Sequence, residues 1–263
     1  MVGHGSLGAV AICSLNIGPA GRGLGRGAPR VALAVAAVVV SAALAAGAVV
    51  LRRGEHPTDA AVRAVRTSLR VVALSFDDGP DPRWTPAMLA VLARYGAHAT
   101  FFVVGRHVIE YPELVREELA AGDELGNHTF THIRLDRLSR DMARSEVQEG
   151  ASAIKVVGGR VPALFRPPLG KTTGTVARIV GAEHERLILW SAAVEHYVDH
   201  HSTRVAVRAL LARVHPGSII LAHDGGPPDR GRTLTALPAI LAGLRARGYR
   251  VVTVSTLLGL TRS

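Results

Sequence analysis

Two adjacent aspartates, Asp77 and Asp78, follow a short apolar run and precede Gly79 and Pro80. Asp-Gly and Gly-Pro pairs are ordinary turn formers, so a simple turn is one interpretation of this motif. Neighbouring residues on a strand point to opposite sides, however, so one carboxylate can bind a metal ion while the other stays free as a base. A single carboxylate could not do both well, because coordination lowers its basicity. The pair is therefore a candidate for metal binding and proton transfer.

His128 and His132 are four residues apart and can converge on one ion if the intervening residues make a helical turn. Two surface histidines would show the same spacing. Thr129 stands where the glutamate of an H-E-x-x-H metalloprotease would be, which excludes that motif. Together with Asp78, the histidines make a set of two imidazoles and one carboxylate that leaves positions open for water and substrate. Such a set suits catalytic zinc and also non-haem iron.

Two further motifs carry a charged or titratable side chain. Arg166 begins an Arg-Pro-Pro-Leu-Gly segment, which is either a structural turn with a surface arginine or a rigid loop that holds Arg166 beside Asp77. In the second case the fixed positive charge would keep the carboxylate ionised. His223 lies before an Asp-Gly-Gly segment and is either a capping residue or a general acid, because imidazole titrates near neutral pH and can protonate a departing amine.

Each of these motifs directly follows a short apolar run that is typical of a strand. Seven such runs occur, at residues 71–76, 99–104, 124–127, 163–165, 187–190, 218–222 and 250–254. Amphipathic patterns typical of helices alternate with them, at residues 85–95, 108–121, 139–157, 173–180, 203–214 and 235–247. This alternation predicts parallel βα units and hence an α/β fold, either a barrel or an open doubly wound sheet. In both folds functional residues gather at the carboxyl ends of the strands.

Composition narrows the classes of protein and of site. A chain of 263 residues has room for one full-sized domain and a small appendage. The single cysteine, Cys13, lies near the N-terminus, so a metal site elsewhere must use His, Asp or Glu. The net charge is +10, but residues 1–53 hold five arginines and no acids, which leaves 26 basic and 21 acidic residues beyond them. Those 26 are scattered, without the clustering that a nucleic-acid groove needs, so we expect no nucleic-acid partner.

An uninterrupted apolar stretch of 21 residues runs from Val31 to Leu51. As a helix it would span roughly 31 Å, about the thickness of the hydrocarbon core of a bilayer. Three arginines precede it, and Ala43-Leu44-Ala45 or Ala46-Gly47-Ala48 could serve a signal peptidase. The sequence therefore predicts a transmembrane anchor or a cleaved signal segment at residues 31–51. Before it we expect a disordered basic tail at residues 1–30, and after it a linker at residues 52–69 and a catalytic domain at residues 70–263.

Taken together, the motifs resemble a known family. Ser75-Phe-Asp-Asp-Gly-Pro80 and Ala99-Thr-Phe-Phe-Val-Val-Gly105 resemble the opening of the polysaccharide deacetylase family, the carbohydrate esterases with a NodB-homology domain. The His128–His132, Arg166–Gly170 and Leu221–Asp224 motifs follow in the order and approximate spacing of that family. The resemblance covers about residues 70–258. It implies a distorted (β/α)7-type barrel and metal-dependent removal of N- or O-acetyl groups from polysaccharides.

The resemblance also implies a role for each motif residue. Asp77 corresponds to the catalytic base of the family, Arg166 to the partner of that base, and His223 to the catalytic acid. The implied metal ligands are Asp78, His128 and His132. Zinc is the expected metal ion, and cobalt or another divalent ion is the alternative. The expected substrate contacts are Pro168, Leu169, Trp190 and Tyr197, with the backbone N–H of Leu169 donating to the oxyanion.

One motif of the family is poorly kept. After Trp190 the family usually has two aspartates and a tryptophan that line the groove and tune the acid histidine. The nearest equivalents here are Ala193, His196 and Tyr197. This departure leaves the choice of substrate open and makes a catalytically weak or silent glycan-binding protein the first alternative.

The expected reaction uses zinc to polarise the acetyl carbonyl and to lower the pKa of a bound water towards about 7. Asp77 would take the proton of that water, and His223 would protonate the leaving amine. Peptidoglycan is the favoured substrate, with chitin-like oligomers or an exopolysaccharide next, so we expect the domain outside the cytoplasm, anchored or secreted. A metal amidohydrolase acting on a small C–N substrate is a further alternative. An iron oxygenase would leave Arg166 and His223 without a role.

Overall fold

The computed structural model describes residues 61–227 and 229–260. The expected basic tail and the predicted membrane segment at residues 31–51 lie outside these ranges. Within the described ranges, no helix has both the length and the apolar character needed to cross a bilayer.

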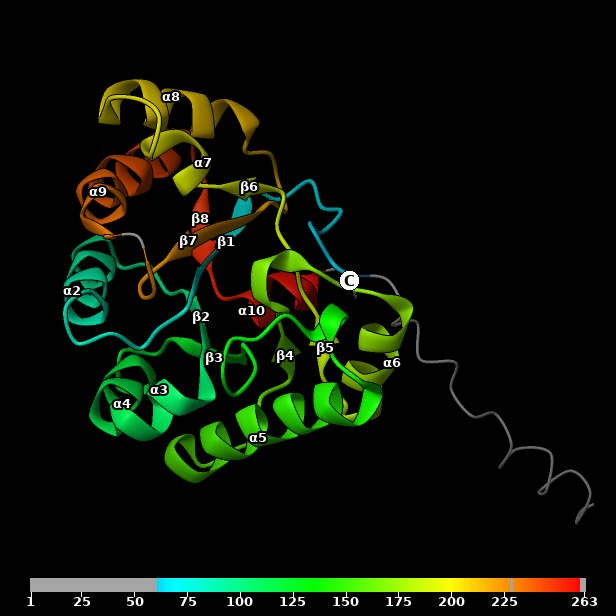
Figure 1. The fold of residues 1–263 in the computed structure, drawn as a ribbon. Coiled ribbons are helices and arrows are strands. Elements are labelled where there is room, and N and C mark those ends of the chain that lie inside the picture. Colours follow the sequence, from blue (N-terminus) through cyan, green and yellow to red (C-terminus); the bar gives the residue numbers. More distant parts are fainter. Residues whose placement is uncertain (1–60, 228, 261–263) are drawn as a thin grey trace, which may run out of the picture. The chain divides into compact units, whose positions relative to one another are not determined.

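The strands form one sheet in the order β5-β4-β3-β2-β1-β7-β6, with β8 paired to β1 away from this path (Figure 1). Every ladder between named strands is parallel. The α/β class predicted from the alternation of strands and helices is therefore confirmed. The strands are β1 (Val71–Asp77), β2 (Thr100–Val103), β3 (Glu124–Asn127), β4 (Leu164–Phe165), β5 (Arg186–Leu187), β6 (Ala192–Ala193), β7 (Ile219–His223) and β8 (Arg250–Val252).

The sheet is curled into a half-barrel, and its two terminal strands, β5 and β6, are not neighbours in the ladder order. The segment before β1 joins the two sides instead, because Val62 forms a bridge with Ile188 and Ala64 forms one with Ser218. Val65 follows and is only 5% exposed. The domain therefore begins before residue 70, and the last residues of the segment predicted as a linker belong to it. The reason is that this segment supplies backbone pairing and buried apolar side chains to the sheet.

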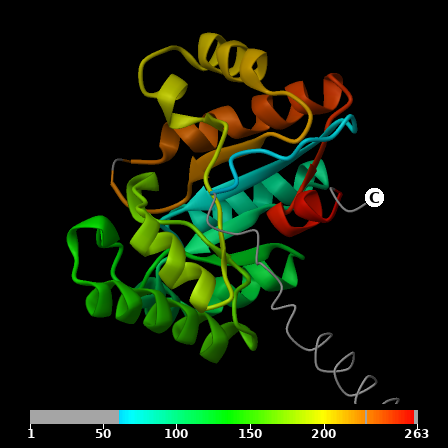
Figure 2. The same ribbon diagram turned by 90° about the vertical axis from the view of Figure 1, so that its right-hand side faces the viewer.

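Helices α2, α4, α5, α8 and α9 cover one face of the curled sheet, because their buried side chains share one apolar cluster with Leu74 and Phe76 of β1. The α10 helix packs with Val71 and Ala73 on the opposite face. Figure 2 shows α8 and α9, in yellow and orange, at one end of the outer layer and α5, in green, at the other. The residues at the two ends of α5 explain where this helix begins and ends. The Ser139 side chain accepts a hydrogen bond from the backbone N–H of Met142 at its start, and Gly159 has φ +80° at its end. The helices are α2 (Thr85–Tyr95), α3 (Gly105–Glu110), α4 (Pro112–Ala120), α5 (Arg140–Gly158), α6 (Gly174–Ala182), α7 (Glu195–Val198), α8 (Thr203–Arg213), α9 (Gly231–Ala246) and α10 (Val254–Gly259), with short 3-10 turns at Leu135–Arg137 and Pro168–Gly170.

One predicted helix, at residues 108–121, is two helices in the structure. The backbone of Tyr111 has φ −126° and ψ 58°, which interrupts the helix between α3 and α4. Pro112 explains the break, because proline disfavours the helical conformation of the residue before it and suits the first position of a new helix.

The core of the domain lies around β1, all seven residues of which are buried. A continuous apolar run is expected for a central parallel strand that is covered on both faces. Phe76 of β1 stacks on Phe101 of β2, with ring centroids 5.0 Å apart. The β1 strand thus leads from the apolar core directly to Asp77 at its carboxyl end.

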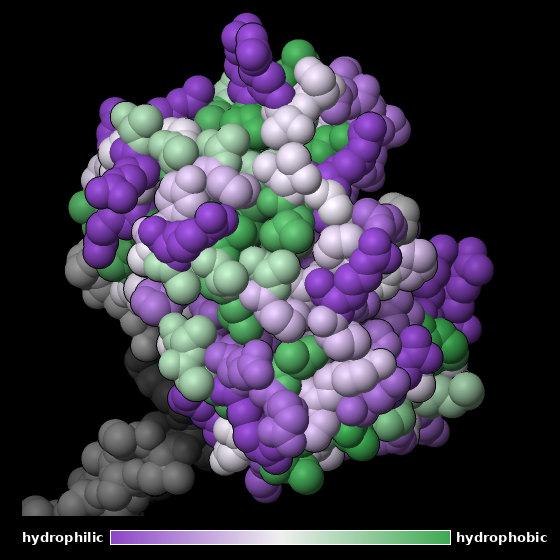
Figure 3. Space-filling model, turned by 90° about the vertical axis from the view of Figure 1, so that its left-hand side faces the viewer, coloured by the Kyte–Doolittle hydropathy of each residue, from purple (hydrophilic) through white to green (hydrophobic). Residues whose placement is uncertain are grey.

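On the surface, the face that bears α2 and α4 shows hydrophilic residues interspersed with hydrophobic ones (Figure 3).

Candidate metal and catalytic site

The sequence motifs meet at the carboxyl ends of the central strands. In the ladder between β1 and β7, Asp77 is the register partner of His223. In the ladder between β3 and β4, Asn127 is the register partner of Phe165, so His128 and Arg166 follow side by side. The parallel pairing therefore gathers the four motifs at one edge of the sheet, as expected for an α/β fold.

Asp78, His128 and His132 come together at this edge. The Oδ1 atom of Asp78 lies 3.1 Å from Nε2 of His132 and 3.4 Å from Nε2 of His128. Two ligand atoms that are each about 2.0–2.1 Å from a tetrahedral ion are about 3.3 Å apart. All three ligand atoms lie within 4.8 Å of one another. The donor set and its spacing thus fit one divalent metal ion.

The spacing of the two histidines required a helical turn for them to converge. In the structure they converge without one. They lie in a loop after β3 in which Thr129 and His132 have φ +68° and +64°. The backbone N–H of His132 donates to the Thr129 hydroxyl at 3.0 Å. Glu146 of α5 accepts hydrogen bonds from the backbone N–H groups of Phe130 and Thr131 at 3.1 and 2.9 Å. The loop reverses direction by these side-chain hydrogen bonds, which the spacing of the histidines alone could not reveal.

His128 is held in a fixed orientation. Its side chain is buried, and its Nδ1 atom lies 2.7 Å from the backbone oxygen of Arg166. Since a carbonyl oxygen can only accept, Nδ1 carries the proton in this contact, and Nε2 keeps its lone pair. That lone pair belongs to the atom that faces Asp78, as metal binding requires.

Asp77 uses one oxygen for structure and keeps the other free. Arg166 donates from Nη1 to Oδ1 of Asp77 at 2.6 Å and to the hydroxyl of Ser75 at 2.9 Å. The Arg166 side chain is fully buried, and its guanidinium lies 4.0 Å from the centre of the Phe102 ring. Oδ2 of Asp77 faces the metal-ligand set, 3.8 Å from Nε2 of His128. Arg166 therefore binds the carboxylate oxygen of the proposed base that does not face His128.

His223 has a carboxylate partner that the sequence did not reveal. Oε2 of Glu195, the first residue of α7, lies 3.1 Å from Nδ1 of His223. Oε1 of Glu195 accepts hydrogen bonds from the backbone N–H of His223 at 3.0 Å and from the Thr233 hydroxyl at 2.9 Å. Burial lowers the pKa of His223, but the negative charges of Glu195, Asp77 and Asp78, with Glu195 contributing most, together outweigh this effect, so the pKa is raised above its ordinary value.

Glu195 therefore supplies the carboxylate next to His223, in place of Ala193 and His196, which the sequence indicates as the nearest equivalents of the family's aspartates. Ala193 ends the short strand β6, and His196 is exposed, with its ring edge-on to that of Tyr197 at 4.9 Å. Neither of these positions supplies a carboxylate. The only sign of this carboxylate in the sequence is Glu195 itself, two residues after Ala193, on a segment too short to predict as a helix.

The site opens into a hollow of about 190 Å³ whose lining includes Asp77, Asp78, His128, His132 and His223. Leu169 and Trp190 complete the lining with Leu221. The backbone of Leu169 has φ +58° and its side chain is 62% exposed. Pro168 and Tyr197, which were expected to contact substrate, lie outside this lining. Pro168 is buried, and Tyr197 packs against the core. Of the expected substrate contacts, Leu169 and Trp190 are at the site.

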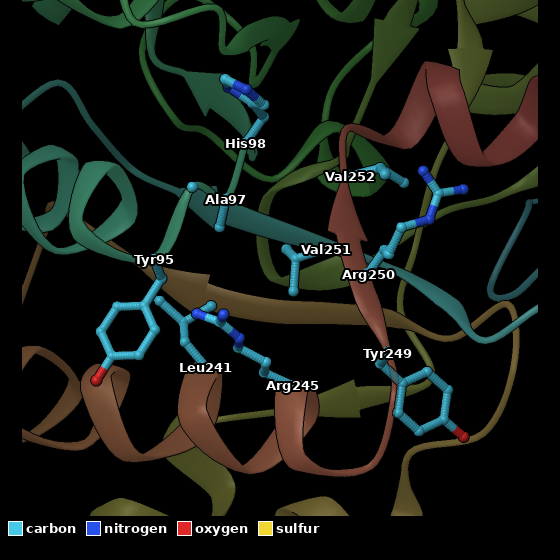
Figure 4. A pocket seen from close by; sticks show the side chains of 10 residues that line it. Tyr95, Ala97, His98, Leu241, Arg245, Tyr249, Arg250, Val251 and Val252 are labelled. Atoms are coloured by element: carbon cyan, nitrogen blue, oxygen red, sulfur yellow. The ribbon is translucent and has the colours of Figure 1, made fainter.

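A second hollow, of about 360 Å³, lies at the other end of the strands (Figure 4). Its walls include Tyr95 at the end of α2 and Val251 of β8, which is the register partner of Val72 near the start of β1. The predicted catalytic and metal-binding residues, all in the described part of the chain, lie outside its lining. The candidate catalytic residues therefore lie at the carboxyl end of the sheet, away from this hollow.

Comparison with known proteins agrees with these motifs. Residues 64–183 match the family model described as polysaccharide deacetylase. The chain is 35% identical over 218 residues to a peptidoglycan-N-acetylglucosamine deacetylase of Bacillus cereus, which covers 79% of this chain and 97% of that protein. It is also 35% identical to a chitooligosaccharide deacetylase of a Bradyrhizobium species, over 69% of this chain and 88% of that protein.

A similar solved structure is a family 4 carbohydrate esterase pseudoenzyme, BA3943 of Bacillus anthracis. It superposes with a TM-score of 0.71 at 25% identity and covers 78% of this chain and 70% of that chain. The fold, the order of the motifs and the extent of the sequence identity agree with one another. The chain belongs to the polysaccharide deacetylase family.

Proposed function

We propose that the protein is a metal-dependent deacetylase that removes N-acetyl groups from a cell-envelope polysaccharide, with peptidoglycan as the favoured substrate and O-acetyl groups as the alternative target. One observation carries the proposal. Oδ1 of Asp78 lies within 3.4 Å of both imidazole Nε2 atoms, while Asp77 beside it keeps its Oδ2 free. This arrangement combines a metal site with an adjacent base.

Asp78, His128 and His132 would hold the ion, and zinc is favoured because two imidazoles and one carboxylate are a common catalytic zinc set. Cobalt or another divalent ion is the alternative. When bound, the ion supplies a Lewis acid for the acetyl carbonyl and a polarised water.

The other residues of the site then have distinct tasks. Asp77 accepts the proton of the attacking water through Oδ2, while Arg166 holds Oδ1. The Leu169 N–H donates to the oxyanion that forms on the acetyl oxygen. His223, whose protonated form the Glu195 carboxylate stabilises, gives its proton to the amine as acetate leaves. Base and acid approach the acetyl group from different strands, β1 and β7.

The space beside the site supports a polymeric substrate. A hollow of about 430 Å³ shares Asp78, His132, Leu169 and His223 with the site and extends along Arg106 and Asp199. A small C–N substrate of an amidohydrolase would not need this extension, whereas a glycan has neighbouring sugars that can occupy it. The names of the similar proteins, which specify peptidoglycan and chitooligosaccharides, support the same class.

A location outside the cytoplasm suits an envelope polymer. We propose that residues 31–51 anchor the domain to the membrane, or that it is secreted if this segment is cleaved. Protease treatment of intact cells measures this directly. We expect the domain to be degraded, and a domain that stays protected until the cells are lysed would contradict the location.

Acetate release from three substrates tests the proposed activity. The panel consists of peptidoglycan, N-acetylglucosamine oligomers and acetylated xylan, each with and without a chelator. We expect release from peptidoglycan to be fastest and to stop when the metal is removed. Release from xylan alone would place the activity on O-acetyl groups, and no release from any member would contradict a deacetylase.

A silent glycan-binding protein is the second candidate. Ala193 and His196 favour it, because they stand where the family has aspartates. The carboxylate of Glu195 next to His223 argues for activity instead. Bound metal together with binding of glycan and no acetate release would decide for the silent protein.

A further inference from the structure

We propose that Arg230 is a positioning residue that fixes the Asp78 carboxylate and thereby sets the affinity of the site for its metal ion. The inference rests on the proposed role of Asp78 as a ligand. Nothing in the spacing of the sequence motifs points to Arg230, which lies 152 residues from Asp78 in the chain.

Arg230 divides the two oxygens of Asp78 between two tasks. Its Nη2 atom lies 3.3 Å from Oδ2 of Asp78, while Oδ1 faces His128 and His132. An aspartate held on one oxygen has the other left for a single bond to an ion. Partners of this kind orient a ligand before the metal arrives.

The guanidinium is itself fixed by the loop after β7. Its Nε donates to the backbone oxygen of Gly225 at 2.7 Å, and its Nη2 donates to that of Pro227 at 3.1 Å. Arg230 is only 4% exposed, so its charge is largely removed from water and depends on Asp78 as its ion-pair partner. A planar fork that binds several acceptors at once is a property of arginine that lysine lacks.

Two glycines of the same loop also lie close to Asp78. A Cβ atom on Gly226, which has φ +65°, would lie 2.7 Å from Oδ2 of Asp78. A Cβ atom on Gly225 would lie 2.5 Å from the backbone oxygen of Asp78. His107 contacts that oxygen from α3, with its Nδ1 3.0 Å away. Asp78, which has φ +76°, is therefore held on its backbone and on the oxygen that does not face the histidines.

Two effects of Arg230 on metal binding oppose each other. Its positive charge repels a divalent cation, so removing it would tighten binding if charge alone mattered. Its hydrogen bond orients the carboxylate, so removing it would weaken binding if position mattered more. The burial of Arg230 and its three acceptors favour the second effect, since loss of a partner that orients a ligand typically weakens metal affinity 10- to 100-fold.

The dissociation constant for Zn²⁺, measured on metal-free protein by competition with a chromophoric chelator, tests the proposal. We expect Arg230→Gln to raise it at least about 10-fold. Arg230→Lys, which keeps the charge but not the fork, should raise it by a smaller factor. Melting of the metal-free proteins shows whether each variant is folded. Acetate release by folded Arg230→Gln should return as zinc is raised above the new constant, because Asp77 and His223 are untouched.

Arg232→Gln is the matched control, two residues away. Its Nη1 atom donates to the backbone oxygens of Val198 and Asp199 at 2.6 and 3.2 Å, so it ties α9 to α7. We expect its zinc constant to stay within about twofold of the wild type. Unchanged or tighter zinc binding by both folded Arg230 variants would overturn the inference. Failure of the wild type itself to bind zinc would instead overturn the proposed function.

Discussion

Asp77 and Asp78 are neighbours in the chain, yet each is held by a different arginine. Arg166 donates to Oδ1 of Asp77, and Arg230 contacts Oδ2 of Asp78. In both cases one carboxylate oxygen is fixed and the other faces the histidines. Two adjacent side chains of the same type thereby acquire different tasks, one as the proposed base and one as the proposed ligand.

Replacing the proposed base should separate catalysis from metal binding. Asp77→Asn keeps the shape of the side chain but cannot accept the proton of water, so we expect kcat/KM for acetate release to fall about 100- to 10,000-fold. Zinc content should stay the same, because Asp78 and the histidines are intact. Asp141→Asn, at the start of α5, is the control for loss of an exposed carboxylate. Asp77→Asn with wild-type activity would refute the assignment.

The pair of His223 and Glu195 predicts a change in the pH profile. The Glu195 carboxylate raises the pKa of His223, so Glu195→Gln should lower that pKa. A general acid acts in its protonated form, and activity is lost as pH rises through its pKa. The alkaline limb of the kcat profile should therefore move to lower pH in Glu195→Gln. Glu113→Gln, in an exposed ion pair with Arg116, should leave the limb in place.

At the scale of elements, the sequence predicted the strands that end in motifs because a buried parallel strand is one apolar run. It could not predict β6, which is two alanines long, or the extent of β5, which ends at Leu187 although the apolar run continues to Trp190. The candidate metal-ligand set was predictable because two of its members share one motif. Glu195 and Arg230 were not, because neither residue belongs to one of the recognised motifs, and only the tertiary fold brings each to its partner, 28 and 152 residues away in the chain.

The close packing of α5 on the histidine loop gives a prediction at this scale. A Cβ atom on Gly150 of α5 would lie 2.3 Å from Oδ1 of Asn127 and 2.9 Å from the backbone of Thr129. Gly150→Ala should therefore push the loop outward, destabilise the fold by about 1–3 kcal/mol and weaken zinc binding.

Gly158→Ala is the control in the same helix. A Cβ atom there would meet its nearest neighbour at 3.3 Å, the flexible end of Leu125. We expect its stability to stay within about 1 kcal/mol of the wild type, since alanine also favours the helix. Denaturant unfolding and chelator competition measure both variants. Equal zinc binding by the two would show that α5 does not position the loop.

At the scale of the whole molecule, stability should depend on a buried acid outside the site. Glu118 of α4 is fully buried, and neither carboxylate oxygen has a hydrogen-bond partner among the described residues. Burial and the negative charges of Asp224 and Asp123 raise the pKa of Glu118 well above its ordinary value of 4.5. The folded protein thus holds this proton more tightly than the unfolded chain does. Its contribution to stability is greatest below pH 4.5 and falls as pH rises.

Glu118→Gln removes this dependence. We expect the variant to melt at a higher temperature than the wild type at pH 8 and at a similar temperature near pH 4.5. Each unit by which folding raises the pKa is worth about 1.4 kcal/mol. Glu117→Gln, at the exposed neighbouring position, should change melting much less. A difference between Glu118→Gln and wild type that is constant across this pH range would contradict the prediction.

The proposed activity depends on one cation binding where three side chains from two loops converge. Anomalous diffraction from crystals grown with zinc locates that cation directly. We predict a single site about 2.0–2.2 Å from Oδ1 of Asp78 and from Nε2 of His128 and His132, with at least one coordination position open. Asp77 should lie beside the ion without binding it. A zinc ion bound elsewhere, or one coordinated by Asp77 in place of Asp78, would contradict the account.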